Sequence, residues 1–359
     1  MAAMTAIRRA LMIGGSGMAH GWIRRFLPTF APRVRIVALA DVNPDVLKAS
    51  GDYLELPASA RFTSMADAFA RVEADCAFVV IPPAFHEEAI VGALDRGMTV
   101  LTEKPLADTW EACARIASHT RRRGGRVAVI QNYRYTAPML QMRDVLRAGT
   151  LGRINHVVGR FAADYRALNS WGAPFRHQIP HGLLVEGAIH HFDMLRNLCG
   201  ADATRVMGQE WNPPWSSSHG AFCAHFLFAM ANGARGIYEG NGTAAGTQNT
   251  WHQEMYRAEC EGGAIAVDRD RIVRLYRHER GRVTIEELPP VRPAREGHEH
   301  IIASFLDWMD GGAAPETVLH GNLKSAAMLF GAIRASEEDR PVDLEAMVDA
   351  ALGATPAPR

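Results

Sequence analysis

Cysteine is scarce in this chain: its 359 residues include five, an odd number, and no two are spaced as C-x-x-C. This pattern argues against a disulfide framework and a thiolate zinc site, and it is typical of the reducing cytoplasm, where we expect the protein to be located. The chain also lacks an excess of either charge, with 39 basic and 39 acidic residues. Because nucleic-acid and anionic-membrane binders usually carry a basic excess, we expect neither partner.

Long hydrophobic runs are also missing. No stretch of about 18 consecutive apolar residues occurs, so we predict no membrane-spanning helix. Near the N-terminus, Arg8 and Arg9 precede a short apolar stretch that runs directly into the glycine-rich turn of residues 14–17. This stretch is too short for the core of a signal peptide, and we interpret it as the first β-strand.

The composition that remains is typical of a folded protein of about two domains, since 48% of the residues are hydrophobic and 22% are charged. Over residues 8–130, short apolar runs alternate with helical patterns, which predicts an α/β domain with a doubly wound parallel sheet at residues 1–131. An extended connection is expected at residues 28–33. The predicted strands are residues 10–13, 34–40, 76–81, 99–101 and 127–130, and the predicted helices are residues 20–27, 64–72, 84–96 and 109–123, with another opened by Asn43 and Pro44.

The pattern changes after residue 131 and predicts an α+β domain over residues 132–345. Apolar stretches flank the turns Asn232-Gly233, Gly262-Gly263 and Arg280-Gly281, which predicts hairpins of a large, mainly antiparallel open sheet. Such a sheet offers a broad face for a homo-oligomer, either a dimer or a tetramer. A frayed tail is expected at residues 346–359. The predicted helices are residues 138–147, 189–199, 300–309 and 322–335, of which the last can pack back on the first domain.

The first predicted strand ends in the turn Gly14-Gly15-Ser16-Gly17-Met18-Ala19. A dinucleotide-binding fingerprint, G-x-G-x-x-G/A, would use Gly14, Ser16 and Ala19. The second strand ends at Asp41, whose carboxylate can accept hydrogen bonds from ribose hydroxyls and would repel a 2′-phosphate, so NAD is favoured over NADP. A glycine turn alone is a weak signal, and Asp41 can also be a solvated residue at a strand end.

A lysine follows another predicted strand, at the edge where parallel sheets bind ligands. Residues 99–101 lead into Thr102-Glu103-Lys104-Pro105. Pro105, whose peptide bond can be cis, would hold Lys104 so that its ammonium points at a substrate oxygen. By residue type alone, Lys104 can also be an ordinary surface lysine.

Three side chains of chemical interest share one face of a predicted helix. Glu186 and His190 are spaced i, i+4, and His190 and Asp193 are spaced i, i+3. A carboxylate beside an imidazole can keep its pKa near neutrality, which suits a general base. The alternative is a core histidine behind an acidic first turn.

These segments together resemble the Gfo/Idh/MocA family, which includes glucose–fructose oxidoreductase, inositol dehydrogenase and their relatives. The resemblance rests on the glycine turn, on Ile81-Pro82-Pro83-Ala84-Phe85-His86, on Glu103-Lys104-Pro105 and on residues 186–193, in the family's order and spacing. It spans essentially the whole chain. Three positions differ from the family's usual residues, because Ser16 and Ala188 replace glycine and Glu186 replaces aspartate.

The resemblance implies a role for each matching residue. Lys104 would bind the reacting hydroxyl and stabilise its developing charge, and His190 would be the general acid/base. Glu186 would contact the substrate or the nicotinamide ribose, and Asp193 would orient the helix or the substrate. The implied cofactor-binding residues are Gly14, Gly15, Ser16, Gly17, Met18, Ala19, Asp41, Ile81, Pro82, His86, Glu103 and Lys104.

An irregular stretch at residues 162–181 is expected to face the substrate, because it offers hydrogen-bond donors and an aromatic surface suited to a sugar or cyclitol ring. No metal site is expected, since His298 and His300 lie two positions apart at a helix start and face different ways. The candidate substrate-binding residues are Lys104, Tyr135, Arg166, Trp171, Arg176, His177, Glu186 and His190.

The sequence therefore predicts an NAD-dependent oxidoreductase that transfers a hydride between a secondary hydroxyl of a sugar, sugar derivative or cyclitol and the nicotinamide, with Lys104 and His190 as the catalytic pair. Two alternatives stay open. One is an NAD-dependent glycosidase that oxidises a ring hydroxyl transiently and eliminates the aglycone. The other is a non-catalytic regulator that binds a dinucleotide.

Overall fold

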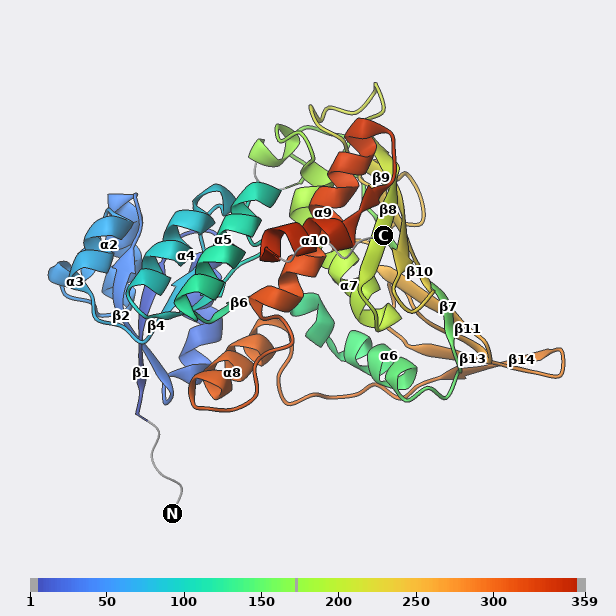
Figure 1. Cartoon of the computed structure of the whole chain (residues 1–359), viewed down its shortest axis with the longest axis horizontal. Helices are drawn as coiled ribbons and strands as arrows, with labels where there is room; N and C mark the ends of the chain where they lie inside the picture. Colours follow the sequence, from blue (N-terminus) through green and yellow to red (C-terminus); the bar gives the residue numbers. More distant parts are fainter. Residues whose placement is uncertain (1–5, 172–173, 354–359) are drawn as a thin grey trace, which may run out of the picture. The chain divides into compact units, whose positions relative to one another are not determined.

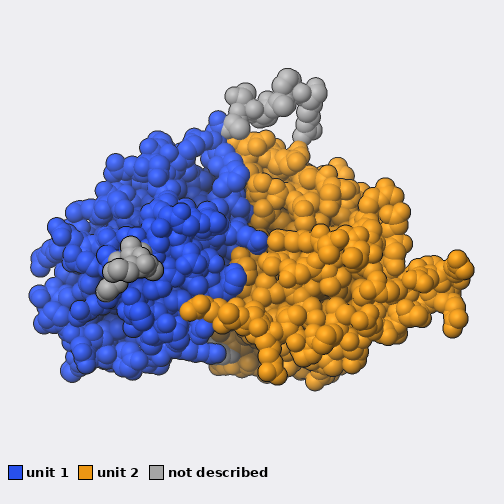
Figure 2. Space-filling view, turned by 90° about the horizontal axis from the view of Figure 1, so that it is seen from below, with its two compact units in different colours: residues 1–131, 298–323, 351–354 blue, residues 132–297, 324–350, 355–359 orange. Residues whose placement is uncertain are grey.

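A computed structural model of the chain describes residues 6–171 and 174–353. These residues form two compact units (Figure 2). Unit 1 contains residues 6–131, 298–323 and 351–353, and unit 2 contains residues 132–171, 174–297 and 324–350. The first segment of unit 1 ends at residue 131, and the segment 298–323 belongs to the same unit.

Unit 1 is built on a parallel sheet with the strand order β3-β2-β1-β4-β5-β6 (Figure 1). All residues of β4 and β5 are buried, and the sequence of β4 is apolar throughout, as is typical of a parallel strand covered on both faces. The doubly wound parallel sheet predicted for this part of the chain is therefore confirmed. The strands are β1 (Arg8–Ile13), β2 (Val34–Ala40), β3 (Arg61–Phe62), β4 (Cys76–Val79), β5 (Thr99–Thr102) and β6 (Val127–Val129).

Local capping signals determine where the helices of unit 1 begin and end. The Asn43 side chain accepts a hydrogen bond from the Asp45 N–H, and the Ser64 hydroxyl accepts one from the Asp67 N–H. Gly124 ends α5 with a φ of 59°, a left-handed conformation that favours glycine. The helical elements are α1 (Met18–Gly21), the π-helix η1 (Trp22–Phe26), η2 (Leu27–Phe30), α2 (Pro44–Tyr53), η3 (Ala58–Ala60), α3 (Met65–Arg71), η4 (Pro83–Phe85), α4 (His86–Asp95), α5 (Trp110–Arg123) and α8 (Gly297–Met309).

One expectation for unit 1 is wrong. Residues 28–33 were expected to be extended, but η2 (Leu27–Phe30) continues the helical path of α1 and η1. Proline is tolerated in the first turn of a helix, so Pro28 does not prevent this short 3₁₀ segment. Leu27 and Phe30 are buried, and this burial stabilises the turn.

Unit 2 contains a larger sheet with the strand order β14-β13-β12-β11-β7-β10-β9-β8-β15. Neighbouring strands are antiparallel except β7 and β10, which are parallel. The three predicted hairpins and the mainly antiparallel sheet are confirmed. The strands are β7 (Ile154–Ala162), β8 (Ala203–Trp211), β9 (Cys223–Met230), β10 (Arg235–Asn241), β11 (Met255–Cys260), β12 (Gly263–Val267), β13 (Arg274–Glu279), β14 (Arg282–Glu287) and β15 (Val342–Asp343).

The helices of unit 2 include the predicted one at residues 189–199, with the same bounds. The expected frayed tail is corrected, because residues 344–352 form α10 and Val348 in it is buried. Residues 354–359 lie outside the described part of the chain. The helical elements are η5 (Asn132–Tyr135), α6 (Ala137–Arg147), η6 (Pro174–His177), the π-helix η7 (Leu184–Ala188), α7 (Ile189–Cys199), α9 (Leu319–Glu338) and α10 (Leu344–Leu352), the last two lying partly in unit 1.

Two further findings concern the chain as a whole. The five cysteines all carry free thiols. Across residues 6–171 and 174–353, no helix combines the length and the apolar character that crossing a lipid bilayer requires.

Candidate functional site

The turn after β1 requires glycine at its first position. Gly14 has a φ of 102°, and a Cβ atom there would lie 2.1 Å from the backbone oxygen of Val80. Gly17 has a φ of 53° and caps α1, and a Cβ on it would meet open space. The backbone of this turn therefore passes close to the sheet on one side and leaves room for a ligand on the other, as pyrophosphate binding requires.

Asp41 lies directly beside this turn. Its Oδ2 accepts a hydrogen bond from the Gly15 N–H at 2.8 Å, and its Oδ1 accepts one from the Asn43 N–H at 2.9 Å. A carboxylate has about four acceptor positions, so two remain for ribose hydroxyls. Val42 next to it is 86% exposed, an unusual exposure for an apolar side chain that an adenine ring would cover. These residues fit a dinucleotide.

The loop after β5 carries Lys104, and the Lys104–Pro105 peptide bond is cis, as the sequence allowed. Glu103 beside it is buried, and its Oε1 accepts a hydrogen bond from Trp22 Nε1 at 2.8 Å and lies 3.1 Å from His298 Nε2. Burial alone would raise the pKa of Glu103, but these two partners and the Lys104 charge hold it below its ordinary value. The Glu103 carboxylate therefore anchors the loop from within unit 1, and the expectation that Glu103 binds the cofactor stays a prediction.

His86 supports the same loop from within unit 1, and the cofactor contact that the resemblance implies for it stays a prediction. Its ring is fully buried, with Nε2 2.9 Å from the Ile81 oxygen and Nδ1 3.0 Å from the Pro105 oxygen. Burial lowers the pKa of His86, so the ring is neutral near pH 7. It joins the segment after β4 to the loop of Lys104, while Ile81 and Pro82 remain at least partly exposed.

Helix α7 presents two neighbouring histidines with different surroundings. The His190 ring stacks on Tyr133, with 4.2 Å between the ring centroids and 13° between the planes. His191 is buried, with Nδ1 2.9 Å from the Tyr238 hydroxyl and Nε2 3.5 Å from the Glu254 carboxylate. His191 is therefore a core histidine, and its ring orientation is fixed by its partners.

Asp193 orients α7 rather than a substrate. Arg134 donates two hydrogen bonds of 2.6 Å to its carboxylate, and the Ser325 hydroxyl donates a third. All three side chains are buried, so this ion pair ties α7 to η5 and to α9. Because Asp193 faces these partners, it holds the helix that carries His190.

Glu186 does not lie on a regular α-helical turn with His190. It belongs to the π-helix η7, and its Oε2 accepts a hydrogen bond of 2.9 Å from Arg176 Nε. Residues 184–188 are therefore a π-helical turn and not a regular α-helical one, and the shared face of Glu186 and His190 stays a prediction. The guanidinium of Arg176 also lies 5.8 Å from the centre of the Trp171 ring, which links Glu186 to the irregular stretch of residues 162–181.

Several residues predicted to contact the substrate are buried. Trp171 stacks on Tyr165 and on Trp251, with ring centroids 5.2 Å and 5.7 Å away. His177 places its Nδ1 3.1 Å from the Ser218 hydroxyl and is fully buried. Tyr135 in η5 is buried as well. These contacts stabilise the surrounding loops, and the substrate contacts of the three residues stay predictions.

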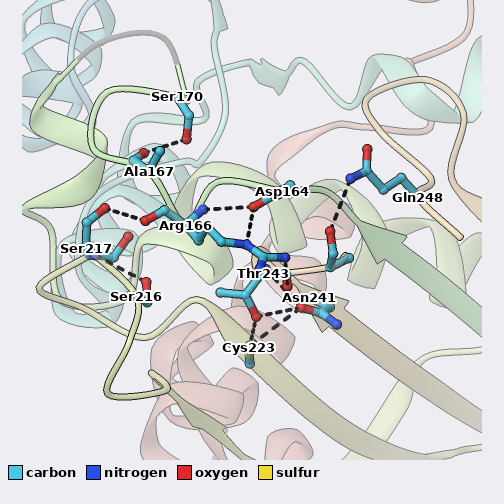
Figure 3. Close-up of polar contacts among 12 residues, drawn as sticks. Asp164, Arg166, Ala167, Ser170, Ser216, Ser217, Cys223, Asn241, Thr243 and Gln248 are labelled. Carbon is cyan, nitrogen blue, oxygen red and sulfur yellow. Dashed lines mark hydrogen bonds and ion pairs between the residues drawn. The ribbon is translucent and has the colours of Figure 1, made fainter. Parts of the chain in front are cut away.

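Arg166 also has structural partners (Figure 3). Its Nε donates a hydrogen bond of 2.7 Å to Asp164, and its Nη2 donates one of 3.1 Å to the Thr243 oxygen. The guanidinium lies over the exposed Trp215 ring, 5.3 Å from its centre. Arg166 thus joins the segment after β7 to the segment after β10, and two of the five N–H donors of its guanidinium make these bonds.

Sequence reasoning missed residues whose importance depends on distant contacts. Trp22 and His298 both contact Glu103, although His298 is 195 positions away from it. Glu254 is a buried acid that precedes β11 without any motif around it. A buried glutamate cannot be recognised by periodicity, so no local signal in the sequence could have identified it.

Each unit, taken by itself, carries groups of chemical interest. Unit 1 has a glycine turn with an acidic neighbour, suited to a dinucleotide, and an ammonium at the carboxyl end of a central strand. Unit 2 has an imidazole whose ring stacks on Tyr133, a group that can accept and return a proton.

Comparisons with known proteins agree with this interpretation. Residues 8–131 match the GFO_IDH_MocA oxidoreductase family, described by its NAD-binding Rossmann fold, and residues 139–266 match the GFO/IDH/MocA C-terminal domain. An uncharacterised protein of Sinorhizobium fredii is 36% identical over 345 residues, which cover 94% of this chain and 96% of that protein. Inositol 2-dehydrogenase of Streptomyces avermitilis is 26% identical over 269 residues, 74% of this chain and 73% of that enzyme.

Among solved structures, the WlbA dehydrogenase of Bordetella pertussis, in complex with NADH and UDP-GlcNAcA, is similar in fold. Its TM-score is 0.78 at 21% sequence identity, and the match covers 94% of this chain and 98% of that one. At this identity the similarity establishes the shared two-part fold.

Proposed function

Since this chain belongs to the Gfo/Idh/MocA oxidoreductase family and its first domain is an NAD-binding Rossmann domain, we propose that it is an NAD-dependent dehydrogenase acting on a secondary hydroxyl of a sugar, sugar derivative or cyclitol. Inositol 2-dehydrogenase among the relatives supports the substrate class. The observation that carries the proposal is the His190 ring, held flat against Tyr133 on a helix that a buried ion pair fixes.

Each group has its own role in the proposed reaction. When bound, NAD supplies the hydride acceptor. His190 takes the proton of the substrate hydroxyl, a general-base contribution of typically about 10²–10⁴-fold. Lys104 donates a hydrogen bond to the same oxygen and stabilises its developing negative charge, a contribution of about 10²–10³-fold. In the reverse direction His190 returns the proton.

Cofactor choice follows from Asp41. Its two free acceptor positions suit the two hydroxyls of an unmodified adenosine ribose. A 2′-phosphate would bring about two negative charges next to this carboxylate, and we therefore propose NAD as the preferred cofactor.

The test is a panel of sugars, cyclitols and glycosides, assayed for NADH formation with wild type and with His190→Gln. We expect NADH formation with at least one polyol, a loss of about 10²–10⁴-fold in kcat for His190→Gln, and nearly unchanged NAD affinity. Release of an aglycone without net NADH would instead identify a glycosidase. NAD binding without turnover of any compound would favour the regulator.

We also propose that the exposed face of the unit 2 sheet pairs with a second copy of this chain. Met207, Leu227 and Ile237 lie in one register row across β8, β9 and β10, and all three are exposed. On β10, Arg235 and Glu239 flank Ile237 on the same face. A two-fold arrangement centred near Ile237 would bring the arginine of each copy toward the glutamate of the other, so the face is self-complementary.

A further inference from the structure

A carboxylate lies in the interior of unit 2, in the lining of a small cavity that it shares with Tyr133. Glu254 directly precedes β11 and is only 6% exposed. A buried carboxylate is expensive unless hydrogen-bond donors surround it, so its position calls for a physical reason.

Three groups converge on Glu254. The His252 N–H donates a hydrogen bond of 3.1 Å to its Oε1, and the Tyr133 hydroxyl is hydrogen-bonded to the same carboxylate. His191 Nε2 lies 3.5 Å from Oε1, at ion-pair distance. Tyr133, His252 and Glu254 also line the same small cavity.

The hydrogen bonds continue to a second tyrosine. With Nε2–H of His191 facing Glu254, its Nδ1 accepts a hydrogen bond from the Tyr238 hydroxyl at 2.9 Å. Burial, followed by the nearby Glu254 charge, raises the pKa of Tyr133 and Tyr238, so both hydroxyls keep their protons. This chain of contacts fixes the direction in which each donor points.

Tyr133 connects this chain to His190. Its hydroxyl is bound at Glu254, while its ring stacks on the His190 ring at 4.2 Å with only 13° between the planes. A small tilt of the phenol would therefore change the orientation of the imidazole. Through this contact, a buried negative charge lies behind the face of His190 that Tyr133 covers.

We propose that Glu254 is a positioning residue for His190: it anchors Tyr133 against the imidazole and stabilises the protonated ring with its buried charge. The other groups around Glu254 do not supply this charge. Arg134 and Asp193 neutralise each other, and the nearby side chains are His191, His252, Tyr165, Tyr238 and Tyr256. Glu254 thus contributes a buried carboxylate to this set, with His191 Nε2 3.5 Å away and with Arg271 and Asp268 lining the same small cavity.

The role in catalysis rests on the function proposed above, but the effect on His190 does not. The experiment is therefore an NMR titration of the histidine rings in wild type and Glu254→Gln, with the His190 signal identified by its loss in His190→Gln. We expect the His190 pKa to fall by about 0.5–1 unit in Glu254→Gln, because the protonated ring loses a nearby negative charge. An unchanged His190 pKa would overturn the proposal.

Glu259→Gln is the matched control. Glu259 lies on the same strand, β11, but is exposed and paired with Arg257 at 3.0 Å, so removal of its charge should leave the His190 titration unchanged. A shift equal to that of Glu254→Gln would mean that any charge on this strand has the effect, which contradicts the proposal.

The Tyr133→Phe variant removes the contact between Tyr133 and Glu254 while the charge of Glu254 stays. It is also the variant to measure if Glu254→Gln does not fold. The ring and its volume stay, but the hydroxyl that binds Glu254 is lost. We expect kcat to fall by about 10-fold with little change in KM, and the Glu254→Asp variant to keep more activity than Glu254→Gln. If wild type oxidises no alcohol, the proposed function fails while the NMR titration still decides the role of Glu254.

Discussion

Arg134 and Asp193 form a bidentate ion pair inside unit 2, with both hydrogen bonds 2.6 Å long and both side chains buried. The pair joins η5, which carries Tyr133, to α7, which carries His190. The same two elements therefore meet twice, once through this ion pair and once through the stacked rings. The position and the ring orientation of His190 therefore depend on both contacts.

Removal of one charge from this pair should be costly. In Asp193→Asn, the Arg134 guanidinium stays buried without a counter-charge, and we expect the free energy of unfolding to fall by about 3 kcal/mol. Urea denaturation measures the loss. Glu261→Gln removes one charge from the exposed pair with Arg153 and should leave the midpoint unchanged. Equal effects of the two substitutions would contradict the importance of burial.

Asp41 should set the preference for NAD over NADP. In Asp41→Asn the repulsion of a 2′-phosphate is lost, and we expect the ratio of NAD to NADP affinity to fall by about 10-fold or more. Fluorescence titration with the reduced cofactors measures both affinities. Asp45→Asn, at an exposed position in the first turn of α2, should keep the wild-type ratio. An unchanged ratio in Asp41→Asn would refute the assignment of this residue.

Helices whose ends carry recognisable capping residues could be predicted from the sequence. The α5 helix is one example, since Thr109 caps its start and Gly124 ends it in the left-handed conformation. The register of β8 was missed, because this strand alternates weakly and Val206 is one of its few fully buried residues. A strand near a sheet edge has little apolar pattern from which to predict it.

The candidate site could be predicted only in part, and for a related reason. Its motif residues Lys104 and His190 follow from the resemblance, but the contacts that hold them do not. Glu103 depends on His298, and His190 depends on Tyr133, whose hydroxyl depends on Glu254. Such contacts form between segments far apart in the chain, where no periodicity or cap reports them.

Trp22 should stabilise the loop of Lys104 through Glu103. In Trp22→Phe the ring is retained but the donor to the buried Glu103 carboxylate is lost, which should cost about 1–3 kcal/mol. Thermal and urea unfolding measure this cost. Trp308→Phe removes an indole from the same unit, where it packs under Arg126, and should be much milder. A comparable loss in both variants would mean that ring volume, and not the hydrogen bond, matters.

His181 should make stability depend on pH. The hydrogen bond with Glu210 raises the pKa of His181 above 6.5, and the Glu337 carboxylate, 3.6 Å from its Nε2, adds to the effect. Because the folded protein binds this proton more tightly, the stabilisation is complete below about pH 6.5 and is lost as the pH rises through the folded-state pKa. The difference in unfolding free energy between wild type and His181→Gln should therefore shrink from about pH 6 to about pH 9. A constant difference would show that the pair is not coupled to folding.

Leu227 should be critical for pairing of two copies. It is 38% exposed at the centre of the row that Met207 and Ile237 complete, so a lysine there would place two ammonium groups in an apolar contact. We expect Leu227→Lys to convert the oligomer to monomer, measured by light scattering during size-exclusion chromatography over a range of concentrations. Ser59→Lys adds the same charge at an exposed position in unit 1 and should leave the mass of the wild type. If Leu227→Lys elutes with the mass of the wild-type oligomer, the copies meet through another surface, because a buried pair of like charges at this row could not be accommodated.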